Sequence, residues 1–332
     1  MTGRLRLGLA TPAWITEWAI HRARRDVEDV EVRYVASRDT ARAAAYASTY
    51  GVPCWGTWSE LLASSEIDAA YIATPNAFHG RMAREALSAG KHVLCEKPLT
   101  LDPAVAREID DLARREGLVF QEAYHYRAHP AVDAALRAVR AGCLGELREI
   151  TVRYGWQLEA PGDIRRFAHL DGGALMDVGC YGLDLLTALG RGRPTHVSAE
   201  YARWAGGVDM ESTIGLRYAD GCWATVGASL AQAGFDCRAR LTGVKGSMDL
   251  DDVFLPVRPG DPDMPVFRAR FGDSVLRETL DGRSSYSWQL ERFVRAIQAG
   301  ERGADCAVVT RAELLNWCAS RLQESEDESE PV

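Results

Sequence analysis

The strongest constraint on the fold is the regular alternation of short apolar strands with helices over the first 123 residues. Strand-forming residues are concentrated at 5–10, 30–36, 69–73, 92–95 and 118–121, and segments with helical spacing separate them. This alternation predicts a parallel α/β sheet with helices on both faces. Ligands of such sheets bind outside the carboxyl ends of the strands, so we expect the functional site there.

The pattern changes after about residue 123. Strand-like segments then follow one another without regular helices between them, at 147–156, 195–204, 211–218, 222–229 and 237–242. Such a run predicts an α+β second domain with one large, mostly antiparallel sheet. We therefore expect domains at 1–123 and 124–322, with a closing helix near 310–322 that could pack back on the first domain.

Composition excludes several classes of protein. The net charge of −8 over 332 residues argues against nucleic acid as a partner. The eight cysteines have no CxxC spacing, which predicts neither a metal site nor a dithiol redox site. No stretch approaches the ~20 apolar residues of a membrane span, and the chain is expected to be cytoplasmic. Residues 323–332 are acidic and predict a disordered tail.

Two motifs carry the candidate chemistry. In residues 95–99, CEKPL, Lys97 follows an apolar strand and precedes a proline. In residues 172–181, GGALMDVGCY, two glycines begin a helix that places Asp177 and Tyr181 four residues apart, on one face. An ammonium group near a phenol favours the phenolate, which suits general acid–base catalysis. These residues predict a nicotinamide-dependent oxidoreductase acting on an alcohol or ketone, with all three side chains catalytic and in contact with substrate.

The end of the second strand favours one nicotinamide cofactor. An acid at this place would bind the ribose 2′-hydroxyl of NAD, but the chain has Ser37 and Arg38 instead. A guanidinium binds phosphate with paired donors, which suits the 2′-phosphate of NADP, and Arg42 could assist. The alternative is a solvated helix start capped by Asp39. We expect NADP(H) to be preferred, with NAD(H) possible.

Together with residues 73–76 (ATPN) and His79, these motifs resemble the Gfo/Idh/MocA oxidoreductase family over nearly all of residues 5–322. Tyr181 stands where many members have histidine. This is similar to the branch that holds glucose–fructose oxidoreductase, dimeric dihydrodiol dehydrogenase, bacterial xylose dehydrogenases and sugar 3-ketoreductases. The resemblance implies a Rossmann domain, an open sheet in the second domain, and NAD(P) hydride chemistry on sugars and polyols. It also implies a homodimer or homotetramer.

The resemblance assigns roles to further residues. In this branch the tyrosine is the acid–base group and the lysine its partner, roles that fall on Tyr181 and Lys97. Cofactor-lining positions are implied at Thr11, Ala13, Trp14, Ile15, Thr74, Pro75, Asn76, His79, Glu96, Lys97 and Arg127. Substrate contacts are implied at Tyr126 and Arg165, where the alternatives are an ordinary domain junction and an exposed charged loop.

The first turn departs from the family pattern. Residues 8–16 read GLATPAWIT, and the three glycines of the usual fingerprint fall on Thr11, Ala13 and Thr16. Glycine there permits a tight turn and close approach of pyrophosphate, whereas Pro12 removes a backbone donor. Threonine hydroxyls could replace the lost contacts, and Trp14 could crowd the pocket.

The sequence therefore predicts an NADP(H)-dependent oxidoreductase that interconverts a ketone and a secondary alcohol on a sugar, polyol or related small molecule. One alternative is a dihydrodiol or aldose dehydrogenase that uses the same residues. Another is a redox-neutral or non-catalytic member of the family with an altered cofactor loop.

Overall fold

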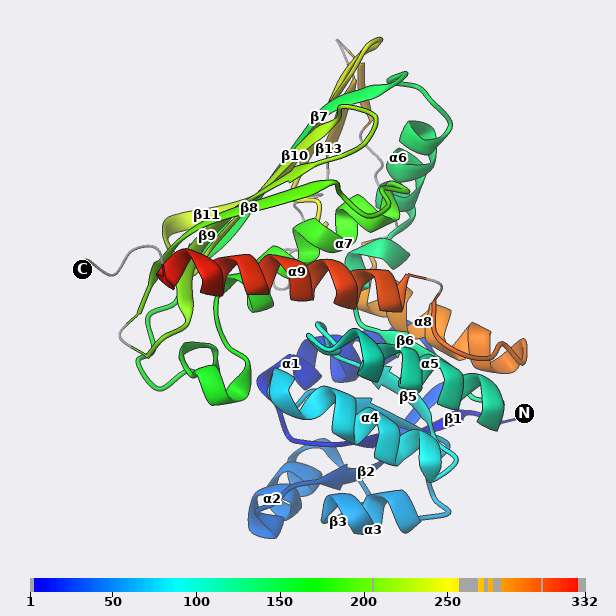
Figure 1. Ribbon diagram of the computed structural model, residues 1–332. Coiled ribbons are helices and arrows are strands. Elements are labelled where there is room, and N and C mark those ends of the chain that lie inside the picture. Colours follow the sequence, from blue (N-terminus) through cyan, green and yellow to red (C-terminus); the bar gives the residue numbers. More distant parts are fainter. Residues whose placement is uncertain are drawn as a thin grey trace. The chain divides into compact units, whose positions relative to one another are not determined.

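The structure is a computed structural model that describes residues 3–204, 206–256, 268–271, 274–276, 282–305 and 307–327 (Figure 1). The chain forms two compact units. The first comprises Met1–Thr100, Ala104–His125 and Tyr286–Val309. The second comprises Leu101–Pro103, Tyr126–Ser285 and Thr310–Val332.

The first unit contains a six-stranded parallel sheet of order β3-β2-β1-β4-β5-β6, as predicted. Its strands are β1 (Leu5–Leu9), β2 (Val30–Ala36), β3 (Cys54–Gly56), β4 (Ala69–Ile72), β5 (His92–Cys95) and β6 (Phe120–Glu122). Every residue of β4 is buried. Parallel strands covered on both faces are apolar throughout, which is why the short runs in the sequence were recognisable.

Helices follow the strands of this sheet. They are α1 (Trp14–Thr16), α2 (Thr40–Tyr50), α3 (Trp58–Ala63), α4 (His79–Ser88) and α5 (Pro103–Glu116), and α8 (Ser285–Gln298) joins this unit from near the end of the chain. A capping box begins α3, in which the Thr57 side chain and Glu60 each satisfy a backbone N–H of the other residue. The sequence indicated these helices, but it missed the short strand β3.

The helix after β1 is less regular than predicted. Residues 15–25 have helical spacing, yet only α1 is α-helical, and π-helical (Glu17–Arg22) and 3₁₀ (Ala23–Arg25) turns continue it. Buried aromatic packing accompanies the π turn. The His21 ring stacks on Tyr50 with centroids 4.0 Å apart, and its Nε2 lies 2.8 Å from the Tyr46 hydroxyl. Burial lowers the pKa of His21 to about 4.

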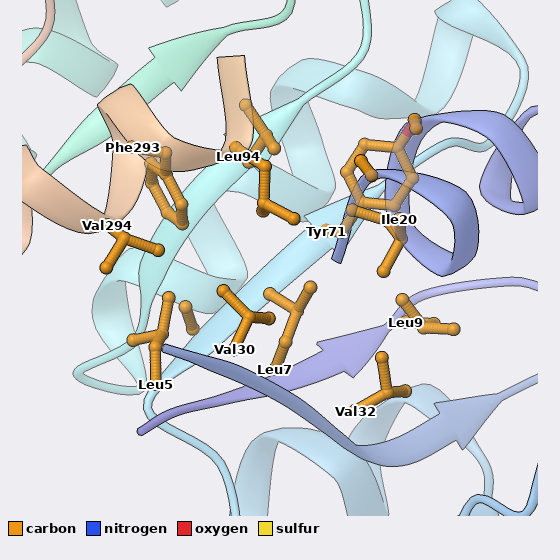
Figure 2. Packing of buried hydrophobic residues seen from close by; sticks show 14 of the residues in the cluster. Leu5, Leu7, Leu9, Ile20, Val30, Val32, Tyr71, Leu94, Phe293 and Val294 are labelled. Carbon is orange, nitrogen blue, oxygen red and sulfur yellow. The ribbon is translucent and has the colours of Figure 1, made fainter. Parts of the chain in front are cut away.

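A helix from the end of the chain completes the core of the first unit. Figure 2 shows Phe293 and Val294 packed beside Leu5 and Leu94, with Leu7 close by. The apolar residues of α8 recur every three or four positions, so one face of the helix is buried. Helix α8 therefore belongs to the core of the first unit, which the sequence did not predict. Periodicity identifies an amphipathic helix, but it does not tell which core the apolar face will cover.

The second unit contains an eight-stranded sheet of order β14-β13-β12-β11-β7-β10-β9-β8, mostly antiparallel as predicted. Strands β7 and β10 pair in parallel. The strands are β7 (Leu147–Gln157), β8 (His196–Arg203), β9 (Asp209–Arg217), β10 (Trp223–Ser229), β11 (Ala231–Gly243), β12 (Gly246–Asp251), β13 (Arg268–Phe271) and β14 (Ser274–Leu276). The sequence missed the last three.

Three helices belong to the second unit: α6 (Pro130–Arg140), α7 (Cys180–Ala188) and α9 (Val308–Asp327), of which α9 begins in the first. Helix α7 packs tightly on the sheet. A Cβ at Gly182 would lie 2.5 Å from Cγ1 of Val226 in β10, so only glycine permits this approach. The approach fixes the height of Tyr181, the residue before it, above the sheet.

Helix α9 extends into the segment that the sequence predicted to be a disordered tail. Helix α9 continues to Asp327, so residues 323–327 are helical, and residues 328–332 lie outside the described part of the chain. Glutamine and glutamate are good helix formers, and no proline occurs between residues 323 and 330. Acidic composition was therefore a poor guide to where the helix ends. Within the described ranges, every helix is too short or too polar to cross a lipid bilayer.

Candidate active site

Several predicted cofactor residues lie around the first turn, directly after β1. Arg42 of α2 donates from Nη2 to the Pro12 carbonyl oxygen at 2.8 Å, which ties α2 to this turn. The Ala13 N–H bonds the Thr11 carbonyl at 2.9 Å, so the turn is closed without glycine. Ile15 is half-buried. The Trp14 indole is 73% exposed, with its ring centroid 6.1 Å from that of Trp18.

The segment after β2 combines a helix cap with an exposed cation. Asp39 accepts hydrogen bonds from the N–H groups of Ala41 and Arg42, so it is the predicted cap of α2. Ser37 is buried, and its Oγ accepts from the Asp39 N–H at 3.2 Å. Arg38 is exposed to solvent. Both readings of this segment are therefore compatible: Asp39 caps the helix while Arg38 remains accessible to a phosphate.

The turn after β4 offers a polar group that suits a dinucleotide. Thr74, Pro75 and Asn76 are all half-buried here. The Thr74 Oγ1 atom is buried and has no hydrogen-bond partner among the described residues. A buried orphan hydroxyl at the carboxyl end of a parallel strand needs a ligand to satisfy it. The residues present at this edge thus fit a nicotinamide dinucleotide.

His79 does not belong to this cofactor-facing set. It is 1% exposed, and both ring nitrogens lie against backbone carbonyl oxygens, Nε2 at 2.7 Å from Thr74 and Nδ1 at 2.8 Å from Pro98. The prediction of a cofactor contact at His79 therefore needs correction, because the ring is enclosed by the chain. The sequence motif placed it correctly in the loop but could not indicate where the ring points.

Lys97 follows β5 in a segment bound to its neighbours. Lys97 itself is half-buried and is joined to Pro98 by a cis peptide bond. The preceding residue, Glu96, accepts a hydrogen bond on Oε1 from the Tyr71 hydroxyl at 2.7 Å. Burial raises the pKa of Tyr71 well above its usual range, so this phenol stays a donor. Glu96 was predicted to face the cofactor, and the structure gives its carboxylate this partner from β4.

In the second unit, the paired glycines explain how residues 172–181 are held. The Gly173 N–H donates to the Arg165 carbonyl at 2.8 Å, and a Cβ at Gly172 would lie 2.4 Å from that same oxygen. Gly173 has φ +106°, and a Cβ there would lie 2.1 Å from Oδ1 of Asp209. The buried Asp209 carboxylate accepts from the Leu175 N–H at 2.7 Å and so caps the helix. Asp209 was not predicted, because it lies 34 residues beyond Leu175 and outside the motif.

We expect Gly173→Ala to lower the free energy of unfolding by about 2–4 kcal/mol, because it adds left-handed strain and displaces the Asp209 cap. Gly190→Ala is the matched control, since Gly190 also has positive φ (+79°) but nothing lies within 4 Å of its Cβ position. The control should show backbone strain alone. Urea denaturation followed by circular dichroism measures both, and equal losses would contradict the role given to Asp209.

Asp177 and Arg165, both predicted for the site, lie together. The Arg165 Nε is 2.9 Å from Oδ2 of Asp177, and its Nη1 is 3.1 Å from Oδ1 of Asp163. These carboxylates, Asp177 foremost, raise the pKa of the Arg165 guanidinium. The guanidinium also lies 5.5 Å from the ring centroid of Trp156. The guanidinium of Arg165 thus lies directly against the Asp177 carboxyl group, a partner within the second unit that the sequence did not predict.

The helical segment around Asp177 has an unusual geometry. Leu175–Gly179 is a π-helical turn that continues into α7 at Cys180. The four-residue spacing of Asp177 and Tyr181 therefore spans a π-to-α transition and not a regular α-helix. Single π turns inside α-helices occur frequently at functional sites.

Tyr181 lies in an aromatic cluster of the second unit. It is 6% exposed, and its ring centroid lies 5.4 Å from that of Tyr154 and 5.2 Å from that of Phe254. Rings at these distances fix the orientation of the phenol. Tyr154 and Phe254 were not predicted, because they come from β7 and from the segment after β12 and share no motif with Tyr181.

The two junction residues, Tyr126 and Arg127, bind a buried carboxylate. The Tyr126 hydroxyl donates to Asp184 at 2.6 Å, and Arg127 Nη1 lies 3.1 Å from the same carboxyl group. Asp184 is fully buried and also lies 3.4 Å from Arg311 Nη1. Tyr126 has no exposed surface, so its predicted role as a substrate contact needs correction. Arg127 remains partly exposed, at 24% of its side chain.

Comparison with known proteins matches both units to one family. The oxidoreductase family with an NAD-binding Rossmann fold, Gfo/Idh/MocA, matches residues 8–124. The C-terminal domain of the same family matches residues 132–249.

Curated relatives are similar over most of their length. D-xylose 1-dehydrogenase (NADP(+)) 2 of Haloferax volcanii is 34% identical over 279 residues, which cover 82% of each chain. dTDP-3,4-didehydro-2,6-dideoxy-alpha-D-glucose 3-reductase of Streptomyces violaceoruber is 33% identical over 325 residues, 94% of each chain.

Solved structures agree. KijD10, a 3-ketoreductase from Actinomadura kijaniata in complex with NADP and TDP-benzene, has a TM-score of 0.85 at 25% identity, covering 96% of this chain and 98% of that one. The fold, the two family matches and the long alignments to curated enzymes all point to the same assignment. The chain therefore belongs to the Gfo/Idh/MocA family and is an NAD(P)-dependent oxidoreductase that acts on CH–OH groups.

Proposed function

We propose that this enzyme uses NADP(H) to interconvert a ketone and a secondary alcohol on a sugar or sugar nucleotide. The observation that carries the proposal is the anchored segment 172–181, which holds Asp177 against Arg165 and Tyr181 in an aromatic cluster. Two relatives support the substrate class, because one is named for D-xylose and the other for a dTDP-linked keto sugar. A homodimer or homotetramer remains our expectation for the assembly.

In the reductive direction, NADPH held at the Arg38 and Thr74 segments would supply the hydride that the carbonyl carbon needs. Tyr181 gives its phenolic proton to the carbonyl oxygen as that oxygen gains charge, and solvent then restores the proton to Tyr181. The Lys97 ammonium stabilises the phenolate and polarises the substrate oxygen. Asp177, held by Arg165, accepts a hydrogen bond from another hydroxyl of the substrate and so orients it. In the oxidative direction the same groups remove a proton from the alcohol.

A binding titration and a substrate panel test this proposal. NADPH fluorescence should show saturable binding, and the panel should contain D-xylose and a trans-dihydrodiol with NADP⁺, and a dTDP-linked keto sugar with NADPH. Turnover of the dihydrodiol alone would favour the alternative suggested by the bovine trans-1,2-dihydrobenzene-1,2-diol dehydrogenase, 34% identical over 224 residues. Absence of binding by both NADPH and NADH would overturn the proposal and favour a sensor or scaffold.

Cofactor preference gives a sharper prediction. We expect Arg38→Ala to weaken NADPH binding by about 10- to 100-fold, since a charge-assisted bond to phosphate contributes roughly 1.5–3 kcal/mol. NADH affinity should change little. Arg25→Ala is the matched control. Arg25 is also exposed, but it precedes the amino end of β2, whereas Arg38 follows the carboxyl end. Equal weakening of NADPH and NADH in Arg38→Ala would remove Arg38 from 2′-phosphate recognition.

A further inference from the structure

The segment that carries Lys97 is held at several consecutive residues. The Cys95 carbonyl accepts from the Ala123 N–H at 2.8 Å, and the Glu96 N–H donates to the Ile72 carbonyl at 2.8 Å. These bonds continue the pattern of the parallel sheet, in which β5 lies between β4 and β6. Beyond Glu96 the sheet pairing stops, and side chains replace backbone groups as partners.

Three buried side chains bind residues 96, 98 and 99. Tyr71 of β4 donates to Glu96 Oε1 at 2.7 Å, and Glu122 Oε1 at the end of β6 accepts from the Leu99 N–H at 2.8 Å. His79 of α4 places Nδ1 2.8 Å from the Pro98 carbonyl oxygen. The exposed fractions of Tyr71, His79 and Glu122 are 1%, 1% and 7%. Lys97 is therefore flanked on both sides by residues fixed to three other elements.

The chemistry of these partners makes them effective. A carboxylate that accepts a backbone N–H forms a charge-assisted bond, and burial removes the competition from water. His79 also lies 2.7 Å from the Thr74 carbonyl, so one ring connects the turn after β4 with the segment after β5. Burial lowers the pKa of His79, with the Lys97 charge acting in the same direction, while the two carbonyl oxygens raise it.

We propose that Glu122 and His79, with Tyr71, are positioning residues that fix residues 96–99 and thereby aim Lys97. The inference rests on the catalytic role proposed above for Lys97, and it adds a reason why a long, flexible side chain is usable there. A lysine has about 2 kcal/mol of rotamer entropy, so catalysis requires that at least its backbone be fixed.

The first test measures local order and needs no substrate. Glu122→Gln keeps an acceptor oxygen for the Leu99 N–H, whereas Glu122→Leu removes it. Hydrogen exchange of the peptide containing residues 96–99, in the whole chain, should be faster by about tenfold or more in Glu122→Leu, because a hydrogen bond to a charged group contributes roughly 1.5–3 kcal/mol. Glu122→Gln keeps the hydrogen bond without its charge, so its exchange rate should lie between those of the wild type and Glu122→Leu.

The matched control lies at the other end of β5. His92 Nδ1 accepts the Val119 N–H at 3.0 Å, so His92→Leu also removes one bond from a side chain to the backbone. In the His92→Leu variant, the peptide containing residues 96–99 should exchange its amide hydrogens at the wild-type rate. Unchanged exchange in Glu122→Leu, or an equal increase in His92→Leu, would overturn the proposal, since the effect would then be absent or merely global.

The second test is kinetic and uses whichever substrate of the panel is turned over. Glu122→Leu should lower kcat by about 100-fold, the cost of misplacing a catalytic group by about 1 Å, while KM and NADPH affinity change little. His79→Leu should also weaken NADPH binding, because it releases the Thr74 turn. Faster exchange with unchanged kcat would overturn the positioning role. A wild type without turnover would refute the proposed function and leave the exchange result to stand alone.

Discussion

Tyr181→Phe should lower kcat by roughly 100- to 10,000-fold, the usual contribution of a general acid or base, and leave NADPH affinity unchanged. The ring would keep its packing against Tyr154 and Phe254, so the hydroxyl is the only group lost. Stopped-flow kinetics measures the loss of turnover, and NADPH titration measures cofactor affinity separately. A fall in kcat with unchanged cofactor affinity is the pattern expected for an interaction made in the transition state.

Tyr154→Phe is the matched control for that experiment. Tyr154 belongs to the same cluster, with its ring 5.4 Å from that of Tyr181, but it lies on β7 and has no proposed proton to transfer. Its loss of hydroxyl should leave kcat close to the wild-type value. If Tyr154→Phe were the inactive variant and Tyr181→Phe retained turnover, the proton donor would be wrongly assigned.

Lys97→Met should also lower kcat by about 100-fold or more, because it keeps the length of the side chain and removes the charge that favours the phenolate. The basic limb of the kcat/KM profile should move to higher pH, since without the ammonium the phenol loses its proton less readily. The chain has three lysines, Lys91, Lys97 and Lys245, which makes the comparison simple.

Lys91→Met serves as its control. The Lys91 Nζ donates to the carbonyls of Ser64 and Ile67 at 2.9 and 3.0 Å, at the amino end of β5. This variant should lose some stability and keep its pH profile. A shifted profile in Lys91→Met, or none in Lys97→Met, would contradict the assignment.

The fold was predictable where local sequence and tertiary packing agree. The strands β1, β2, β4 and β5 lie where strand-forming residues are concentrated, and helices separate them as the alternating pattern predicted. The strands β12 to β14 were missed, because they are short and because the outward positions of β12 and β13 carry charged residues such as Asp249 and Arg270, which are uncommon in strands. Those charges pair across strands, as Arg240 does with Asp249, which only the sheet register makes visible.

The candidate site was predictable in its chemistry and less so in its contacts. Lys97, Asp177, Tyr181 and Arg165 were chosen from motifs, and the structure pairs Asp177 with Arg165. The partners that hold these residues come from distant parts of the chain, as Asp209 does for the helix start at Leu175. No spacing rule indicates such contacts.

His79 and Tyr126 illustrate the opposite error. Both occur in motifs that suggest ligand contacts, and both are buried with polar atoms directed at the chain itself. A motif records that a residue matters at a site. It does not separate a residue that touches the ligand from one that holds the ligand-binding segment in place.

The most direct test of the account is a double-mutant cycle between Lys97 and Tyr181, measured as kcat/KM for wild type, Lys97→Met, Tyr181→Phe and the double variant. If the ammonium acts through the phenol, the double variant will be no slower than Tyr181→Phe alone, because groups that act as a unit are not additive. If the two losses instead multiply, the lysine and tyrosine work independently, and the proposed acid–base pair is wrong.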